Sequence, residues 1–237
     1  MAVNLIDAHV SSPPIAQNKL ALRRVFETIH ADSCPTSYNF HMHTVCSDGR
    51  LTPEDLIQQA IEIGLKGLAI TDHHSVNGYR RAQQWLDSYD EAYHSGHSKA
   101  PKLWTGVEVT SKLLDIEVHI LGYAFDLDSP FMQGYLQGRA PQNVAAFAEH
   151  VVTNIHAAGG IAVLAHPVRY RKTPDELIAE AVRIGIDGVE TYYAYDNPSP
   201  WRPSPRQTET IQRLSSTYGL LNTCGTDTHG SSLLQRL

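Results

Sequence analysis

Two histidines and an aspartate within residues 41–49 have a spacing that suits metal binding. The stretch reads His-Met-His-Thr-Val-Cys-Ser-Asp-Gly and follows the aromatic run 38–40, which is typical of a strand entering a core. Side chains alternate along a strand, so His41 and His43 point to the same face and can bind one metal ion. Asp48 adds an oxygen ligand in a turn. Alone, the pattern also fits a pair of buried, hydrogen-bonded histidines beside an ordinary turn.

Side chains of the same kind recur along the rest of the chain, on or directly after each strand-like segment. They are Asp72, His73, Glu108, His119, His166, Glu190, Asp227 and His229. Imidazoles and carboxylates without a thiolate suit Zn, Mn or Fe. Each histidine must be neutral to bind a metal, so we expect activity to fall at acid pH. Cys46 lies near the first histidines and is expected to pack as a small residue.

Strand-like and helix-like segments alternate from residue 38 onward, which indicates an α/β fold. Strands are predicted over 38–44, 67–71, 104–110, 117–125, 161–165, 186–193 and 220–224. Helices are predicted over about 53–63, 76–89 and 142–157, after Thr173, and up to Tyr218. Thr52 is the expected N-cap of the first of these helices and Gly64 its end.

An internal similarity supports repeated helix–strand units. Residues 51–71 contain Thr-Pro-Glu-Asp-Leu-Ile and end on a strand after a glycine, and residues 172–191 repeat this order. Repeated units of this kind predict a parallel sheet, and seven strands with intervening helices predict a (β/α) barrel. The C-terminal ends of barrel strands meet at one mouth, which would bring the polar side chains together.

Composition restricts the class of protein. The chain has 237 residues, 42% of them hydrophobic, enough for one barrel domain. A net charge of −6 without a basic patch predicts no stable nucleic-acid complex, although bound metal ions would let a nucleotide bind as substrate. Three cysteines fit a reducing cytosol, and the absence of a signal peptide or long apolar stretch predicts a cytoplasmic protein without a membrane partner. The oligomeric state is not indicated.

Together, the motifs resemble the PHP family, named after bacterial DNA polymerase and histidinol phosphatase. They are His41-x-His43, Ser47-Asp48-Gly49, Thr71-Asp72-His73, Gly106-Val107-Glu108, His119, Ala165-His166-Pro167 and Gly225-Thr226-Asp227-Thr228-His229. They occur in the family's order. The resemblance implies a distorted (β/α)7 TIM-like barrel over residues 38–237. Residues 1–37 are predicted to form an N-terminal extension with a helix over 15–30, where apolar residues have helical spacing. The resemblance also implies up to three divalent metal ions in a cleft, and hydrolysis of phosphoesters.

The resemblance further implies which side chains hold each metal ion. The first ion would be held by His41, His43, Glu108 and Asp227, the second by Glu108, His119 and His166, and the third by Asp48, His73 and His229. Glu108 would bridge the first two ions. The metals would lower the pKa of a bound water and present hydroxide at neutral pH. Glu108, Asp227 and His229 are the predicted catalytic residues, with His229 and the third metal assisting the leaving oxygen.

Two further residues are predicted to bind substrate. Arg169, which follows His166-Pro-Val, has the bidentate donor geometry that suits a phosphate, although it also fits a surface arginine after a turn. Glu190 ends a predicted strand and suits either a substrate contact or the support of a ligand.

Relatives that act on nucleotides and RNA ends resemble this chain most closely around 117–122 and 165–170. Many of them carry a long helical insertion between these two motifs, whereas here only residues 123–164 lie between them. We therefore expect a more open cleft, and the substrate of those relatives does not transfer directly.

The predicted function is hydrolysis of a phosphomonoester, of a nucleotide or a similar small substrate, by metal-activated hydroxide. One alternative is an exonuclease that trims nucleic-acid ends, against which the charge of −6 weighs. A second is a metal-bound module without turnover, against which the complete set of ligands weighs. An amidohydrolase would also begin with His-x-His, but it does not account for Asp48, His73 and His229 together.

Overall fold

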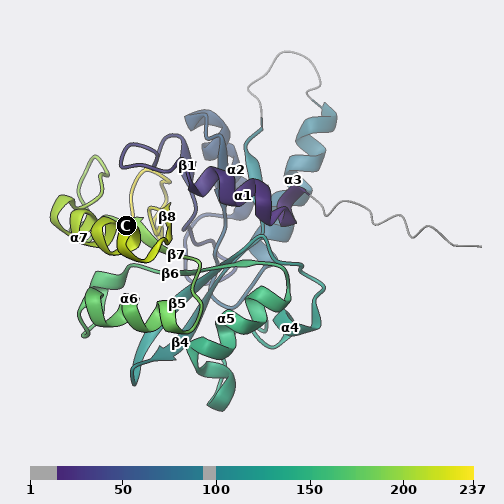
Figure 1. Ribbon diagram of the computed structural model, residues 1–237. Coiled ribbons are helices and arrows are strands. Elements are labelled where there is room, and N and C mark those ends of the chain that lie inside the picture. The colour runs from purple at the N-terminus through teal and green to yellow at the C-terminus, as the bar shows by residue number, and fades with distance from the viewer. Residues whose placement is uncertain (1–14, 93–99) are drawn as a thin grey trace, which may run out of the picture.

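The computed structural model describes residues 15–92 and 100–237 (Figure 1). The strands are β1 Tyr38–Asn39, β2 Gly67–Ala69, β3 Lys102–Trp104, β4 Gly106–Leu113, β5 Ile116–Tyr123, β6 Ile161–Leu164, β7 Gly188–Tyr192 and β8 Leu221–Cys224. The α-helices are α1 Lys19–Phe26, α2 Pro53–Ile63, α3 Asn77–Ala92, α4 Pro130–Gln133, α5 Ala148–Ala157, α6 Pro174–Arg183 and α7 Pro205–Tyr218. Short 3-10 helices span Ile15–Gln17, Asn143–Ala146 and Pro167–Arg169. Within these described ranges, no helix has the length and apolar character needed to span a membrane.

The strands form two sheets that join into a distorted barrel, as predicted. The first sheet has the order β1-β2-β3 and the second the order β4-β5-β6-β7-β8. At one junction His73, which follows β2, pairs in parallel with Glu108 of β4. At the other, the backbone N–H of Phe40 donates to Cys224 O over 3.0 Å, and Met42 pairs in parallel with Thr228.

The prediction of a wholly parallel barrel is wrong at β5, which runs antiparallel to β4 and β6. The turn Leu114-Asp115 between β4 and β5 has φ values of 49° and 61°, the positive pair found in tight hairpin turns. A tight turn reverses the chain, whereas parallel neighbours need a long crossover. The segment predicted as one strand over 104–110 also divides at Thr105, between β3 and β4.

The predicted helix starts are confirmed where capping residues stand. The backbone N–H of Asp55 donates to Thr52 Oγ1 over 3.1 Å, and α2 ends at Gly64 with φ 81°. Thr173 and Glu176 form a reciprocal capping box at the start of α6. The helix predicted from residue 142 begins later, at Ala148, after a 3-10 turn. These capping contacts set the residues at which α2 and α6 begin, after the segments that carry the candidate ligands.

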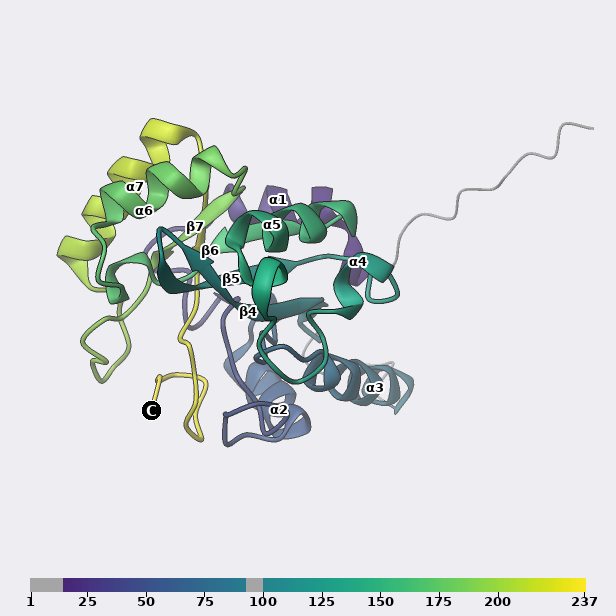
Figure 2. The ribbon, with the colours of Figure 1, turned by 90° about the horizontal axis from the view of Figure 1, so that it is seen from below.

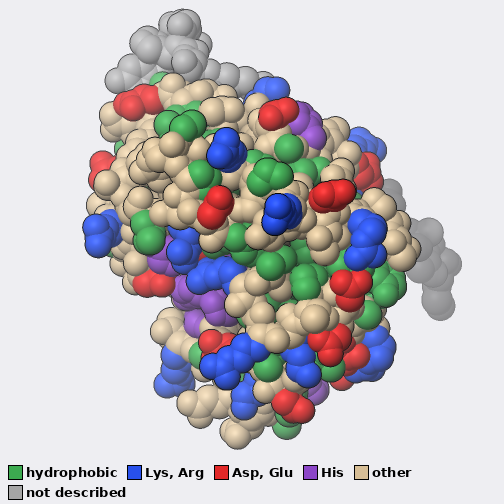
Figure 3. Space-filling model, turned by 90° about the vertical axis from the view of Figure 1, so that its left-hand side faces the viewer, with side chains coloured by type: hydrophobic (Ala, Val, Ile, Leu, Met, Phe, Trp, Pro, Cys, Tyr) green, Lys and Arg blue, Asp and Glu red, His purple; other side chains and the backbone are tan. Residues whose placement is uncertain are grey.

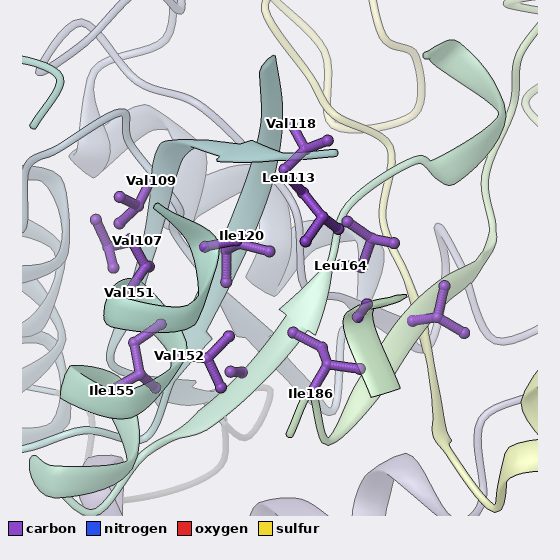
Figure 4. Close-up of a cluster of buried hydrophobic side chains, with 14 of the residues drawn as sticks. Val107, Val109, Leu113, Val118, Ile120, Val151, Val152, Ile155, Leu164 and Ile186 are labelled. Atoms are coloured by element: carbon purple, nitrogen blue, oxygen red, sulfur yellow. The ribbon is translucent and has the colours of Figure 1, made fainter. Parts of the chain in front are cut away.

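The core lies between the strands and the surrounding helices (Figure 2). Figure 2 shows α1, α5, α6 and α7 on one side of the strands and α2 and α3 on the other. The largest cluster joins β4, β5 and β6 to α5 and includes Val107, Ile120 and Ile155 (Figure 4). Helix α1 buries Phe26 edge-on against Phe40, with ring centroids 4.9 Å apart. The separation of a 1–37 extension from the barrel remains a prediction.

Candidate metal centre

The predicted ligand residues come together on one side of the barrel. Three overlapping groups place their ligand atoms within 4.8 Å of one another: His41, His43, Glu108 and Asp227; His43, Asp48, His73 and His229; and His73, Glu108 and His119. Figure 3 shows histidine side chains in a recess of the surface, with arginine or lysine side chains beside them. Segments from both ends of the chain therefore build a single cluster.

Glu108 of β4 lies at the centre of this cluster and is 1% exposed. Its Oε2 lies 3.0 Å from His41 Nε2 and 3.1 Å from His43 Nε2. Its Oε1 lies 2.7 Å from His119 Nδ1 and 3.2 Å from His166 Nε2. Each oxygen thus faces a different pair of imidazoles, which is the arrangement expected of a carboxylate shared by two metal ions.

His119 reaches Glu108 because of the hairpin. In the β4–β5 register Thr110 lies opposite His119, and Glu108 lies two residues along the same face. The antiparallel strand therefore delivers the histidine that a parallel strand was predicted to deliver.

Asp227 completes the group around His41 and His43. Its Oδ1 lies 3.3 Å from His43 Nε2 and 3.4 Å from His41 Nε2. Asp227 has a positive φ of 54°. Two residues earlier, a Cβ at Gly225 would collide with His41. The Gly-Thr-Asp turn therefore brings this carboxylate close to the first strand.

Asp48 forms the outer edge of the cluster. Its Oδ2 lies 3.2 Å from His229 Nε2 and 3.7 Å from His73 Nε2, and its side chain is 53% exposed. The inner carboxylates are buried, so a substrate from solvent would meet the groups around Asp48 first.

Unpartnered nitrogens show that the cluster fits metal ions. Neither ring nitrogen of His43 makes a hydrogen bond of suitable geometry, nor do Nδ1 of His73 and Nδ1 of His166. Buried polar atoms normally have partners, so these nitrogens call for an explanation. Imidazole and carboxylate donors that converge without a thiolate suit Zn, Mn or Fe.

Burial and the charges of neighbouring groups shift the pKa values of several side chains in the cluster. Burial lowers the pKa of His43, but the close negative charges of Asp227 and Glu108 outweigh burial and raise the pKa to about 9. Burial would raise the pKa of Glu108, yet the charges and hydrogen bonds of His41 and other histidines hold it well below its usual range. Burial lowers the pKa of His73 to about 4. A metal must therefore displace a proton from His43.

The family model for the PHP domain matches residues 39–226. The chain belongs to the PHP domain family. A 5'-3' exoribonuclease of Haemophilus influenzae is 24% identical over 81% of this chain and 89% of its own length. The probable phosphatase YcdX of Escherichia coli is 28% identical over 60% of this chain and 58% of its own length. A solved structure from Bifidobacterium adolescentis, assigned as a metal-dependent phosphoesterase, has a TM-score of 0.65 and 21% identity, covering 83% of this chain and 89% of that one.

In this PHP domain Glu190 supports a ligand. It is fully buried in β7, its Oε1 lies 2.9 Å from His41 Nδ1, and its Oε2 accepts the backbone N–H of His166 over 2.9 Å. The contact with Nδ1 orients the His41 ring so that Nε2 faces Glu108. Both oxygens contact groups inside the protein, which favours the support of a ligand over a substrate contact for Glu190.

Asp72 organises the turn that carries Asp48. Its Oδ1 accepts the backbone N–H of Thr44 and the hydroxyl of Ser47, each over 2.7 Å, and its Oδ2 accepts the Thr44 hydroxyl. A Cβ at Gly78 would collide with Asp72 Oδ2, so the start of α3 passes close behind the turn.

The second oxygen of Asp227 has three donors. Tyr193 O–H donates to Oδ2 over 2.7 Å, Arg236 Nε over 2.8 Å and Arg169 Nη1 over 3.1 Å. Arg169 was predicted to bind a substrate phosphate and not to contact Asp227, and its side chain is 40% exposed. Tyr193 and Arg236 were missed, because neither belongs to a motif and both reach Asp227 only through tertiary structure.

The other histidines that the structure describes are not part of the three ligand groups. His30 and His150 are exposed. His156, which lies on α5, pairs with Asp187 over 2.7 Å. His74 contacts the hydroxyl of Thr110 over 3.1 Å. His9, His94 and His97 fall outside the described residues.

Proposed function

We propose that this PHP domain removes phosphate from a small phosphomonoester, a nucleotide or a similar molecule, with two or three bound divalent ions. The observation that carries the proposal is the cluster around Glu108, in which three ligand groups share side chains and open to solvent at Asp48. At the level of the family, the prediction of a metal-dependent phosphoesterase is confirmed.

The proposed ligand sets follow the shared carboxylate. His41, His43, Glu108 and Asp227 would hold one ion, and Asp48, His73 and His229 another. Glu108, His119 and His166 would hold a further ion, since both histidines contact Glu108 Oε1. His43 lies beside the set that includes Asp48 as well, since its Nδ1 is 3.5 Å from Asp48 Oδ1. We propose Mn, Zn or Fe as the ions, in keeping with the donor atoms.

When bound, such ions supply a water of lowered pKa and positive charge for the phosphoryl oxygens. His229 is held in one tautomer, because its Nδ1 donates to the backbone oxygen of Asp227 over 2.8 Å. Its Nε2 faces Asp48 Oδ2 over 3.2 Å and would be the atom that binds a metal ion. Arg169 Nη1 donates to Asp227 Oδ2 and to the Tyr193 hydroxyl oxygen, and the half-exposed guanidinium has further donors for a substrate phosphate.

A second candidate function is trimming of RNA ends. The exoribonuclease relative aligns over 89% of its own length, which favours this candidate. A hollow of about 390 Å³ lined by Gln137, Arg139 and Gln142 offers room for a neighbouring nucleotide. It lies on the segment whose Gly138 N–H donates to His74 O over 2.8 Å, directly after His73.

Phosphate release separates the two candidates. The Mn²⁺-supplemented protein would be assayed with nucleoside monophosphates, nucleoside 3′,5′-bisphosphates, histidinol phosphate and short 5′-phosphorylated oligoribonucleotides, with Asp227→Asn in parallel. We expect phosphate from the small substrates, lost in the variant. Release of nucleotides from oligoribonucleotides alone would favour the exonuclease. No product from any substrate, with metal bound, would favour a module without turnover.

A further inference from the structure

The C-terminal segment 230–237 enters the metal centre through Arg236. The side chain donates from Nε to Asp227 Oδ2, and the backbone oxygen accepts the N–H of His229 over 2.7 Å and of Gly230 over 3.2 Å. The side chain is only 23% exposed. Arg236 is therefore tied both to the carboxylate of Asp227 and to the backbone of the turn that carries His229.

The same segment is anchored to α2 by one glutamine. Leu233 is fully buried in the cluster that α2 forms, and its backbone N–H donates to Gln59 Oε1 over 3.1 Å. Gln59 Nε2 donates to Ser231 O over 3.0 Å. The hydroxyl of Thr228 also donates to Gln235 O over 2.7 Å. The position of Arg236 is thus set by contacts on both sides of the segment.

Asp227 has to present one oxygen to His41 and His43 and keep the other away. With only Oδ1 facing the imidazoles, rotation of the carboxylate would lose that contact. Donors on Oδ2 oppose this rotation, and groups that orient a metal ligand typically change metal affinity or activity by about 10–100-fold. Both oxygens of Glu108 face histidines instead, so Asp227 is the inner ligand held by guanidinium groups within the described residues.

We propose that residues 230–237 are part of the metal centre, with Arg236 as a positioning residue for Asp227 and Gln59 as its remote anchor. The inference rests on the proposed role of Asp227 as a metal ligand. It makes a surface glutamine of α2 a determinant of metal affinity, although its side chain contacts no ligand residue.

The test is Mn²⁺ binding without substrate, measured as bound metal and as affinity in competition with a chelator. The variants are Arg236→Ala, Arg236→Lys, Gln59→Ala and the Arg236→Ala/Gln59→Ala double variant. Arg213→Ala and Gln58→Ala are matched controls, since Arg213 pairs on the surface with Asp175 and the exposed Gln58 donates to Glu62 on the same helix.

We expect Arg236→Ala to weaken Mn²⁺ binding about tenfold, with partial recovery in Arg236→Lys. Gln59→Ala should weaken it in the same direction, and the double variant should bind no more weakly than Arg236→Ala, because both changes act through one contact. The controls should bind as wild type. Thermal unfolding of the metal-free variants should match the metal-free wild type.

Wild-type affinity in Arg236→Ala, or fully additive losses in the double variant, would overturn the inference. If metal-free Arg236→Ala unfolds early, the comparison of Arg236→Lys and Gln59→Ala decides, since unchanged affinity in both would also overturn it. A wild-type protein that binds Mn²⁺ but releases no phosphate would contradict the proposed function and leave this inference standing. Undiminished metal in Asp227→Asn would remove the ligand role on which both rest.

Discussion

At the scale of single residues, the cluster depends on imidazoles that neighbouring carboxylates hold in place. His41 shows this most clearly, since Nε2 faces Glu108 and Asp227 while Nδ1 faces Glu190. Such a residue is fixed from both sides of its ring. Removing the ring and removing its support should therefore have different effects.

Replacing His41 by alanine should remove the ion proposed between Glu108 and Asp227 and abolish phosphate release. The fold should persist, because the apolar clusters that join the strands to the helices do not include His41. Metal content and circular dichroism would check this, with His150→Ala as the control, since His150 is exposed on α5. Full turnover in His41→Ala would show that the first metal site is misplaced.

Replacing Glu190 by glutamine keeps its size but removes its charge. We expect weaker metal binding by about 10–100-fold and a smaller change in KM, because Glu190 orients His41 and does not reach substrate. Metal titration beside steady-state kinetics would separate the two. A rise in KM with unchanged metal affinity would instead restore the substrate-binding role.

At the scale of elements, strand ends and helix starts position the ligands through close packing. The start of α3 passes behind Asp72, which holds the 44–48 turn by accepting hydrogen bonds from Thr44 and Ser47. This contact leaves no space for a side chain at Gly78. The outer ligand Asp48 therefore depends on a helix that carries no ligand itself.

Gly78→Ala should destabilise the protein by about 1–3 kcal/mol, the usual cost of overpacking. It should also reduce activity by displacing Asp72. Denaturant unfolding and the assay above would measure both. Gly134→Ala is the matched control, because a Cβ there meets nothing within 4 Å and the φ is −68°. Equal stability of the two variants would contradict the predicted contact.

At the scale of the whole molecule, metal binding, protonation and stability are coupled. The pKa of His43 in the metal-free protein is raised to about 9, above an unfolded value of about 6.5. Charged His43 therefore stabilises the metal-free protein fully below about pH 6.5, and this stabilisation is lost as pH rises through about 9. A metal ion needs the neutral ring, so it competes with this proton.

Stabilisation by Mn²⁺ should therefore grow between pH 6.5 and 9. Thermal unfolding with Mn²⁺ and with EDTA would be compared across this window, and the difference in midpoint should widen as pH rises. The physical reason is that a smaller fraction of His43 carries a proton at higher pH, so the metal ion has fewer protons to displace. A difference that stays constant, or narrows, would show that His43 does not release a proton on metal binding.

The sequence by itself determined the types and order of the candidate ligands and the capped starts of α2 and α6, because these follow from side-chain chemistry and from neighbours along the chain. The spacing of His41 and His43 and the caps at Thr52 and Thr173 belong to this class. Only the tertiary structure decided that β5 runs antiparallel, since a tight turn at Leu114-Asp115 is a local backbone choice that hydrophobic periodicity does not record.

Tertiary structure also decided which groups support the ligands. Glu190 contacts His41 across 149 positions of the chain, and Arg236 reaches Asp227 only because Leu233 is buried beside α2. Such contacts depend on closure of the barrel and on packing at a distance, and no local pattern encodes them. The motifs therefore determine which chemical groups the candidate site contains, and the fold determines how these groups are oriented.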